Sequence, residues 1–135
     1  MIANPKPKRR KTSPRRAAVK SADDAFSRYI KARDGNRCVQ CGERERVTCG
    51  HLYTRAAYAT RWNPDNAAAQ CIGCNLRHEH DFIPFYRYFI DKYGQEKVDD
   101  LYTLHKSSVH FKTYQIEEIA RFFNKKADEL SGGAA

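Results

Sequence analysis

The sequence predicts an α+β fold: a small cysteine-held core of two strands and one helix, flanked by an N-terminal helix and by two or three C-terminal helices. Three observations lead to this prediction. Apolar residues recur at helical spacing towards both ends of the 135-residue chain, short strand-like segments lie between them, and two Cys-x2-Cys pairs bracket those segments. A chain of this length corresponds to one domain with at most an additional tail.

The first half of the chain predicts one helix, two short strands and a second helix. Apolar residues at helical spacing place the first helix near residues 22–33. Residues 46–52 and 67–70 are the strand candidates, and the breaker-rich segment between them, 53–66, is predicted to be a loop. The second helix is predicted to begin near Cys74.

The second half of the chain is predicted to be helical. Asp81 can cap a helix that carries Pro84 in its first turn and ends at Gly94. Further apolar patterns predict a shorter helix around residues 98–105 and a longer one around 113–130.

Positive charge is concentrated at the N-terminus. All eight charged residues among the first twenty are basic, and the whole chain has a net charge of +9. Prolines and the lack of large apolar residues predict that residues 1–20 form a disordered arm. The rest is predicted to divide into a core over 21–81 and a helical extension over 82–135. A basic run in the arm is expected to contact phosphates: Lys8, Arg9, Arg10 and Lys11. The alternative is that the arm is only a solubilising tail.

The four paired cysteines predict a structural zinc site. Between Cys38-x2-Cys41 and Cys71-x2-Cys74 lie 29 residues, and two such pairs of thiolates can complete a tetrahedral site. The alternatives are two disulfides or four core cysteines. The sequence has no membrane-spanning run and no secretory signal, so we expect a protein of the reducing cytoplasm, where disulfides are rare. Cys49 is predicted to be a small buried residue.

The motifs around these cysteines resemble a known family. The segments that carry the resemblance are Cys38–Gly42, Gly50–Leu52, Arg61–Asn66, Gln70–Asn75, Tyr86–Ile90 and Lys92–Gly94. They are similar to the zinc-stapled HNH nucleases with a ββα-metal site, and above all to the phage lambda NinG (Rap) recombination endonuclease family. The resemblance covers residues 30–105 and implies a ββα-metal core with nuclease activity.

The resemblance also implies roles for three residues. His51 matches the general base, and an imidazole can take a proton from water at cellular pH. Asn66 matches the middle residue, which ties the loop and helps to orient the base. Asn75 matches a ligand of a catalytic Mg2+ or Mn2+, cations that prefer oxygen donors. For His51 the alternative is a core histidine at the end of a strand.

Position 50 departs from the family pattern. Many HNH sites have a metal-ligating Asp or His directly before the general base, whereas Gly50 has no side chain. Residues three and four positions after Asn75 share its helix face, so His78 and Glu79 are the expected additional ligands, with Glu79 preferred for a hard cation. A solvated or capping role is the alternative for each of them.

Arginines are the candidate DNA-binding residues of the core, because a guanidinium group binds phosphate bidentately. Arg55, Arg61 and Arg77 lie in or beside the segment between the cysteine pairs. Arg77, on the predicted helix, is expected to approach the scissile phosphate. Trp62 is expected to pack in the core rather than to stack on a base.

Together these observations predict a metal-dependent DNA endonuclease of HNH type. By resemblance, its substrates are branched recombination intermediates (Holliday junctions or D-loops), other recombination proteins are potential partners, and a phage-encoded chain would act in the host cytoplasm. A junction cutter makes paired nicks, so we expect a homodimer with its interface at Phe122 and Phe123, which no single helix face can bury. Two alternatives stay open: a non-catalytic zinc-stabilised DNA-binding module, and an HNH endonuclease that reads sequence.

Overall fold

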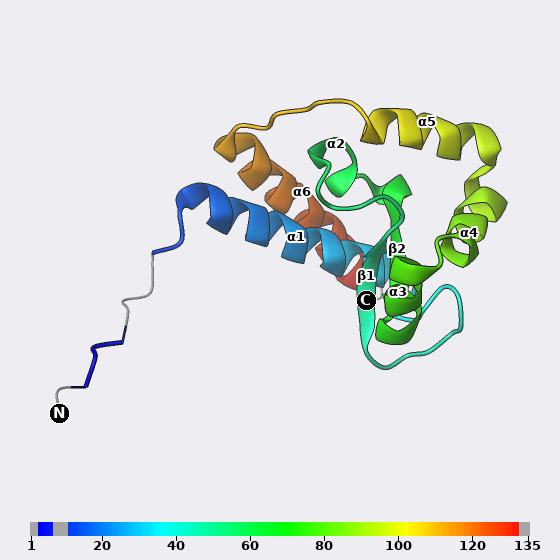
Figure 1. Cartoon of the computed structure of the whole chain (residues 1–135), viewed down its shortest axis with the longest axis horizontal. Coiled ribbons are helices and arrows are strands. Elements are labelled where there is room, and N and C mark those ends of the chain that lie inside the picture. Colours follow the sequence, from blue (N-terminus) through cyan, green and yellow to red (C-terminus); the bar gives the residue numbers. More distant parts are fainter. Residues whose placement is uncertain (1–2, 7–10, 133–135) are drawn as a thin grey trace.

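The computed structural model describes residues 3–6 and 11–132 and has the expected α+β architecture (Figure 1). In the described part, a two-stranded hairpin and the helix that follows it lie between a long N-terminal helix and three C-terminal helices. The elements in chain order are α1 (Pro14–Arg33), β1 (Val47–His51), α2 (Tyr58–Arg61), the 3-10 helix η1 (Pro64–Asn66), β2 (Ala67–Cys71), α3 (Ile72–His80), α4 (Ile83–Tyr93), α5 (Gln95–His105) and α6 (Thr113–Gly132).

Helix α1 begins earlier than the sequence pattern predicts. The Ser13 side chain accepts a hydrogen bond of 3.2 Å from the Arg16 backbone N–H, and Pro14 occupies the first turn, where its missing N–H costs nothing. Residues 14–20 are therefore helical, and the prediction of a disordered arm over residues 1–20 is wrong for this part. Lys11 is exposed. Three of the predicted arm contacts, Lys8, Arg9 and Arg10, lie outside the described residues.

Helices α1 and α6 lie side by side and build the larger apolar core (Figure 1). Alanines at four-residue spacing on α1 (Ala18 and Ala22) allow the helix backbones to approach closely. Phe123 packs edge-on against Phe26 with ring centroids 5.0 Å apart. Phe123 is thus buried within the chain, whereas Phe122 is 53% exposed, and a dimer interface at these two residues stays a prediction.

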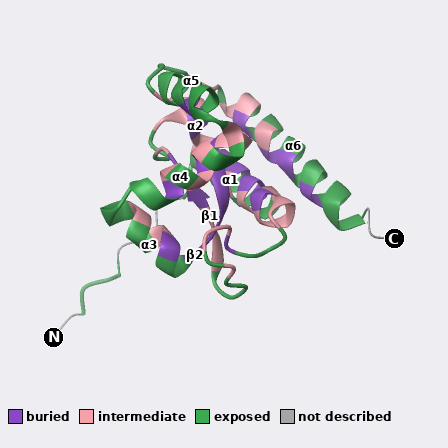
Figure 2. Cartoon of the chain, turned by 90° about the vertical axis from the view of Figure 1, so that its right-hand side faces the viewer, coloured by how far each residue is buried: buried purple, intermediate pink, exposed green. Residues whose placement is uncertain are grey.

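Strand β2 of the hairpin is buried throughout, whereas β1 is mostly half-buried, in the burial colours of Figure 2. Strands β1 and β2 pair antiparallel, with His51 opposite Ala67 and Thr48 opposite Gln70. All five residues of β2 are buried. Ala67 packs in the core with α1, and Ala68 packs with the aromatic residues of α4. Small side chains on β2 thus let helices cover both faces of a two-stranded sheet.

Helices α4 and α5 form the second core with Phe85, Phe89, Val98 and Leu101. The Asp81 carboxylate accepts a hydrogen bond of 3.3 Å from the Ile83 backbone N–H, and α4 ends at Gly94, whose φ is 89°. The predicted loop 53–66 contains the short elements α2 and η1. No helix in the described part of the chain is both long and apolar enough to cross a membrane. The division into a core over 21–81 and an extension over 82–135 stays a prediction.

A candidate metal centre and an adjoining cavity

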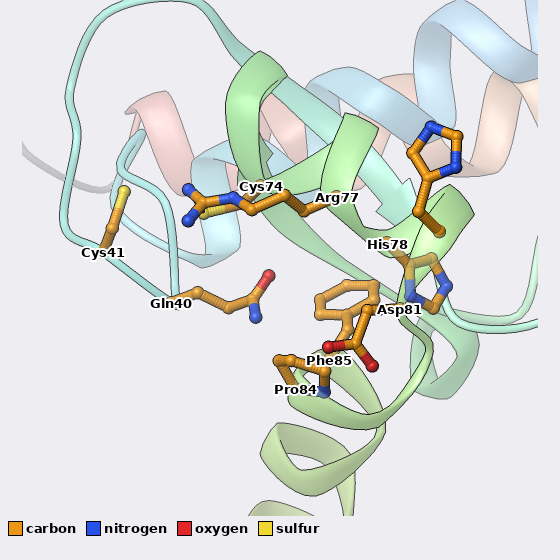
Figure 3. A pocket seen from close by; sticks show the side chains of 9 residues that line it. Gln40, Cys41, Cys74, Arg77, His78, Asp81, Pro84 and Phe85 are labelled. Carbon is orange, nitrogen blue, oxygen red and sulfur yellow. The ribbon is translucent and has the colours of Figure 1, made fainter.

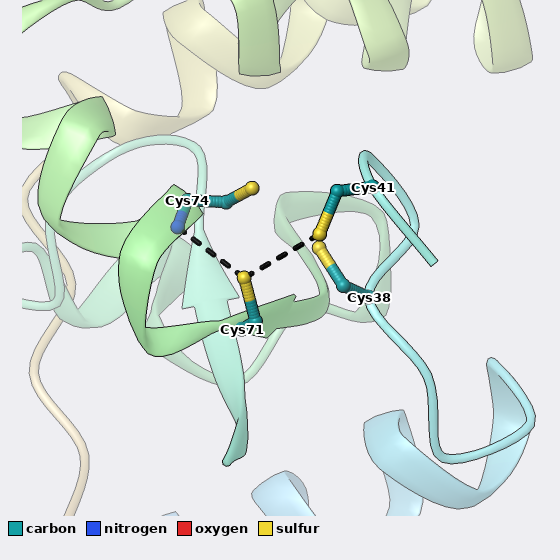
Figure 4. Close-up of side chains that lie close together, drawn as sticks. All are labelled: Cys38, Cys41, Cys71 and Cys74. Atoms are coloured by element: carbon teal, nitrogen blue, oxygen red, sulfur yellow. Dashed lines mark hydrogen bonds between the residues drawn. The ribbon is translucent and has the colours of Figure 1, made fainter. Parts of the chain in front are cut away.

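The four paired cysteines converge at one point (Figure 4). The Sγ atoms of Cys38, Cys41, Cys71 and Cys74 all lie within 4.8 Å of one another. One pair comes from the turn after α1, and the other joins the end of β2 to the first turn of α3. All five cysteines of the chain lie in the described part and none forms a disulfide, so that alternative is wrong. Four converging thiols fit a tetrahedral structural zinc ion.

Ionisation of these thiols favours a bound cation. Burial would raise the pKa of Cys38, but backbone N–H groups of Cys71, Cys41 and Gln40 lower it to about 6. Burial and the neighbouring sulfur atoms raise the pKa of Cys74 to about 12. Once one thiol has ionised, its negative charge makes it harder for the next thiol to lose its proton. A bound divalent cation compensates these negative charges and so favours four thiolates. Cys49 lies outside the cluster and packs against the α1–α6 core.

Several predicted site residues line a cavity of about 600 Å³. Four predicted residues meet here: His51, Asn75, His78 and Glu79. They come from the end of β1 and from α3. The remaining lining residues, from α1, β1 and the segment after β1, are Asp23, Asp24, Phe26, Ser27, Cys49, Leu52, Thr54 and Arg55.

His51 is held with one ring nitrogen bonded and the other unpaired. Its Nε2 lies 3.0 Å from the Arg61 carbonyl oxygen. A carbonyl oxygen only accepts, so Nε2 carries the proton and Nδ1 of the neutral ring keeps its lone pair. Within the described residues Nδ1 has no hydrogen-bond partner. Burial lowers the pKa of His51 to about 4, so the imidazole is neutral at physiological pH.

Asn75 is oriented by Thr48, a residue that the sequence reasoning missed. The Thr48 hydroxyl donates to the Gln70 carbonyl oxygen at 2.7 Å, and the Asn75 Nδ2 lies 3.3 Å from the same hydroxyl oxygen. Because the single hydroxyl proton is committed, Thr48 accepts from the Asn75 amide N–H. The Asn75 Oδ1 is thereby left as an acceptor. Alternation along β1 does not reveal this role, because it depends on the packing of α3 on the hairpin.

His78 and Glu79 complete the polar lining from α3. The His78 Nε2 lies 3.1 Å from the Leu52 carbonyl oxygen, and its Nδ1 is buried with no hydrogen-bond partner among the described residues. The ring packs against Phe85, with centroids 5.0 Å apart. Glu79 is exposed. Apart from the four cysteines, no group of three or more His, Cys, Asp or Glu side chains converges in the described ranges 3–6 and 11–132.

Asn66 ties the segment that follows β1. It is fully buried, and its Nδ2 donates to the carbonyl oxygens of Tyr53 (3.0 Å) and Thr60 (3.1 Å). Its Oδ1 accepts from the Tyr53 backbone N–H at 2.9 Å. Each of these bonds goes to the backbone of the segment between the strands, so Asn66 fixes the path of the chain from His51 towards Arg61.

The three predicted DNA-binding arginines have different surroundings. The Arg61 guanidinium group binds the Asp23 carboxylate at 2.9 and 2.6 Å, and its contact with phosphate stays a prediction. The contact of Arg77 with the scissile phosphate also stays a prediction. Arg77 lies 3.5 Å from the Cys74 sulfur and lines a separate cavity of about 430 Å³ beside the metal centre (Figure 3). Arg55 is exposed and borders the His51 cavity. Trp62 is buried in the core, as expected.

Comparisons with known proteins agree with the resemblance at the level of the family. The family model for the bacteriophage lambda NinG protein matches residues 3–131. Protein ninG of Escherichia phage lambda is 32% identical over 96 residues, which cover 68% of this chain and 47% of the relative. Protein ninG of Salmonella phage P22 is 27% identical over 121 residues, covering 87% and 59%.

The chain spans about half the length of the lambda relative. No solved structure matches significantly. A family model that matches almost the whole chain nevertheless assigns it, and this protein belongs to the family of the bacteriophage lambda NinG protein.

Proposed function

We propose that this protein is a metal-dependent DNA endonuclease of HNH type that uses His51 as its general base. The observation that carries the proposal is the placement of an unpaired imidazole nitrogen beside oxygen donors on one cavity. His51 contributes the imidazole, and Asn75 and Glu79 contribute the oxygens. The cysteine centre, with zinc bound, would hold the end of β2 and the start of α3 in the arrangement that brings these groups together.

His51 is suited to accept a proton from water. In the proposed step a water oxygen attacks phosphorus, its proton passes to the His51 Nδ1, and the bond from phosphorus to the leaving 3′ oxygen breaks. The Arg61 carbonyl oxygen keeps the other ring nitrogen protonated, so the accepting nitrogen is always Nδ1. The low pKa of His51 keeps the base unprotonated at neutral pH, and the negative charge of a phosphodiester would raise that pKa.

Asn75 Oδ1 and the Glu79 carboxylate are the groups that would hold a catalytic cation. A bound Mg2+ or Mn2+ would supply charge stabilisation for the phosphorane and for the leaving oxygen. Two protein donors are few, but Mg2+ often keeps several waters and takes its remaining ligands from substrate phosphate. His78 is the further candidate, since its Nε2 is bonded to a backbone carbonyl in the manner of metal-ligating histidines.

Basic residues beside the cavity support a nucleic-acid substrate. Arg15, Arg16 and Lys20 of α1 line a second hollow, which meets the His51 cavity at Asp23, Asp24 and Arg55. A phosphate backbone that reaches His51 could therefore continue along the N-terminal half of α1. The proposed preference for branched recombination intermediates comes from the resemblance to the NinG (Rap) family, as do possible partners in recombination.

One observation favours a different function, that of a non-catalytic zinc-stabilised DNA-binding module. Position 50 carries no ligand, and the space that a side chain would enter there is filled by Gln70. A protein that only binds DNA has no need of a ligand at this position.

Cleavage assays with a matched histidine control separate these functions. The zinc-loaded chain is incubated with a four-way junction, or with a linear duplex of the same sequence, in Mg2+ or Mn2+. We expect cleavage of the junction, and His51→Ala should lower its rate at least about 100-fold with DNA binding retained. His110→Ala, at an exposed residue outside the cavity, should cleave normally. Binding without cleavage by the wild type would favour the module, and equal cleavage of both DNAs would contradict the branched preference.

A further inference from the structure

Helix α1 reaches the proposed general base from outside the strand–strand–helix unit. Its residues Asp23, Asp24, Phe26 and Ser27 form one wall of the His51 cavity. The Phe26 ring lies 5.7 Å from the His51 ring, centroid to centroid, and is itself buried. Helix α1 therefore contacts the imidazole through Phe26.

Building on the proposed function, we infer that Asp23 is a positioning residue for His51 and that it acts through Arg61. The Asp23 carboxylate accepts three hydrogen bonds from two successive residues. Arg61 donates two of them, from Nε at 2.9 Å and from Nη2 at 2.6 Å, and the Trp62 indole N–H donates the third at 2.9 Å. Asp23 thus fixes both side chains at the end of α2 with a bidentate pair and one further bond.

The residue that Asp23 fixes is the one whose backbone orients the base. The Arg61 carbonyl oxygen, 3.0 Å from the His51 Nε2, is the one hydrogen-bond partner of that imidazole within the described residues. A helical turn of only four residues, Tyr58–Arg61, carries this carbonyl. Because so short a helix is marginal by itself, its end needs an external contact to hold the carbonyl in place.

The surroundings of Asp23 indicate that it orients His51 through hydrogen bonds rather than through the long-range effect of its charge on the imidazole. Burial would raise the pKa of Asp23, but hydrogen bonds from Arg61 and Trp62 and the charges of Arg61 and Arg55 lower it, so the carboxylate is ionised. Its charge is offset by that of Arg61 in the same pair, with side-chain exposures of 20% and 16%. The net field that this pair exerts on His51 is correspondingly small, and the geometric constraint remains.

The test compares Asp23→Asn with Asp128→Asn in the zinc-loaded full chain. Asp128 also pairs with an arginine of α1, Arg28, but this pair is exposed and joins α1 to α6 away from the cavity. Long-range ¹H–¹⁵N NMR reads the tautomer of His51 directly, and cleavage of a four-way junction in Mn2+ gives kcat and KM. Near-UV circular dichroism checks that each variant is folded.

We expect the wild type and Asp128→Asn to show a single Nε2-protonated tautomer of His51. In Asp23→Asn the two tautomers should mix, and kcat should fall about tenfold or more with KM little changed. If Asp23→Asn does not fold, Arg61→Met decides by the same readouts, since it removes the other half of the pair and keeps the backbone carbonyl. A pure Nε2 tautomer with unchanged kcat in the folded variant would overturn the inference.

These measurements test the proposed nuclease function and the positioning role of Asp23 separately. If the wild type cleaves no DNA, the nuclease proposal fails, whereas the tautomer of His51 still reports whether Asp23 holds the ring. A mixed tautomer in Asp23→Asn would then support positioning of His51 by Asp23 without catalysis. An unchanged tautomer would reject the positioning role as well.

Discussion

The Oε1 atom of Gln70 lies 2.2 Å from the point where a β-carbon on Gly50 would stand. The two residues are diagonal neighbours on the same face of the hairpin, because Gly50 pairs with Ala68 and Gln70 pairs with Thr48. Gln70 is fully buried, and its Nε2 is held by the Gln40 Oε1 at 2.6 Å. The Gln70 side chain is therefore held in place and cannot easily move aside. It occupies the place from which a residue at position 50 would otherwise reach α3.

Gly50→Ala should therefore destabilise the fold. Displacing Gln70 breaks its bond to Gln40 or shifts β1, and we expect a loss of about 2 kcal/mol in the free energy of unfolding, measured by urea denaturation. Gly73→Ala is the matched control, because the nearest atoms to a β-carbon there are 4.0 Å away and the site is helical. Equal stability of Gly50→Ala and the wild type would show that Gln70 can move.

The same contact decides whether the usual metal ligand can be restored. Gly50→Asp should lose more stability than Gly50→Ala, since it adds a carboxylate to the same buried space. The double variant Gly50→Asp/Gln70→Ala should recover part of that loss, because removal of the glutamine side chain opens the space. Urea denaturation of four proteins, the wild type, Gly50→Asp, Gln70→Ala and the double variant, measures this coupling, and strictly additive losses would contradict the close contact.

Removal of the structural metal should unfold the hairpin and α3. The segment between the cysteine pairs contains a two-stranded sheet, which is marginal without further support. We expect one zinc ion per chain by elemental analysis, and Cys71→Ser or a chelator should abolish zinc binding and cooperative unfolding. Cys49→Ala should keep its zinc, because Cys49 lies outside the cluster. A chelated wild type with an unchanged melting transition would contradict a stabilising metal.

Thr48→Val should weaken the binding of the proposed catalytic cation without affecting the binding of zinc. The substitution keeps the shape of the side chain and removes the oxygen that accepts the Asn75 amide N–H. Asn75 is then free to turn its N–H groups towards the cavity, so the Mn2+ concentration for half-maximal cleavage should rise about 10-fold to 100-fold. Thr48→Ser keeps the hydroxyl and should behave like the wild type. A normal Mn2+ dependence in Thr48→Val would show that Thr48 does not orient Asn75.

The sequence predicted those parts of the site that depend on short-range spacing. The cysteine pairs, the strands before and after the loop, and the shared helix face of Asn75, His78 and Glu79 follow from intervals of two to four residues. The partners of Asp23 and Thr48 could not be predicted in this way. Asp23 meets Arg61 38 residues further along the chain, and Thr48 meets Asn75 27 residues further along.

The start of α1 was missed for a different reason. Charge and proline content suggest disorder locally, but Ala18 and Ala22 are buried against α6, almost a hundred residues away. Packing against a distant helix stabilises a segment that local composition alone describes as unfolded. The pairing of Arg61 with Asp23 was missed similarly, because an exposed guanidinium and one paired with a distant carboxylate look the same in the sequence.

Burial of neutral His51 should make the stability of the protein depend on pH. Its pKa is lowered from 6.5 to about 4. Below pH 6.5 the unfolded chain therefore binds a proton that the folded chain excludes, and the folded state loses stability as the pH falls, until both states are protonated near pH 4. The full loss is about 3 kcal/mol, of which about 2 kcal/mol falls between pH 7.5 and pH 5.

His51→Gln removes this group and should flatten the pH dependence by about that amount. Urea denaturation of the two proteins at pH 7.5 and at pH 5 measures the effect as a difference of differences. Protonation of the metal-binding thiols also destabilises the fold in acid, but it acts equally on both proteins and cancels in the comparison. Parallel stability curves for the wild type and His51→Gln would mean that the imidazole has the same pKa in the folded and the unfolded chain and that it is not the desolvated base described above.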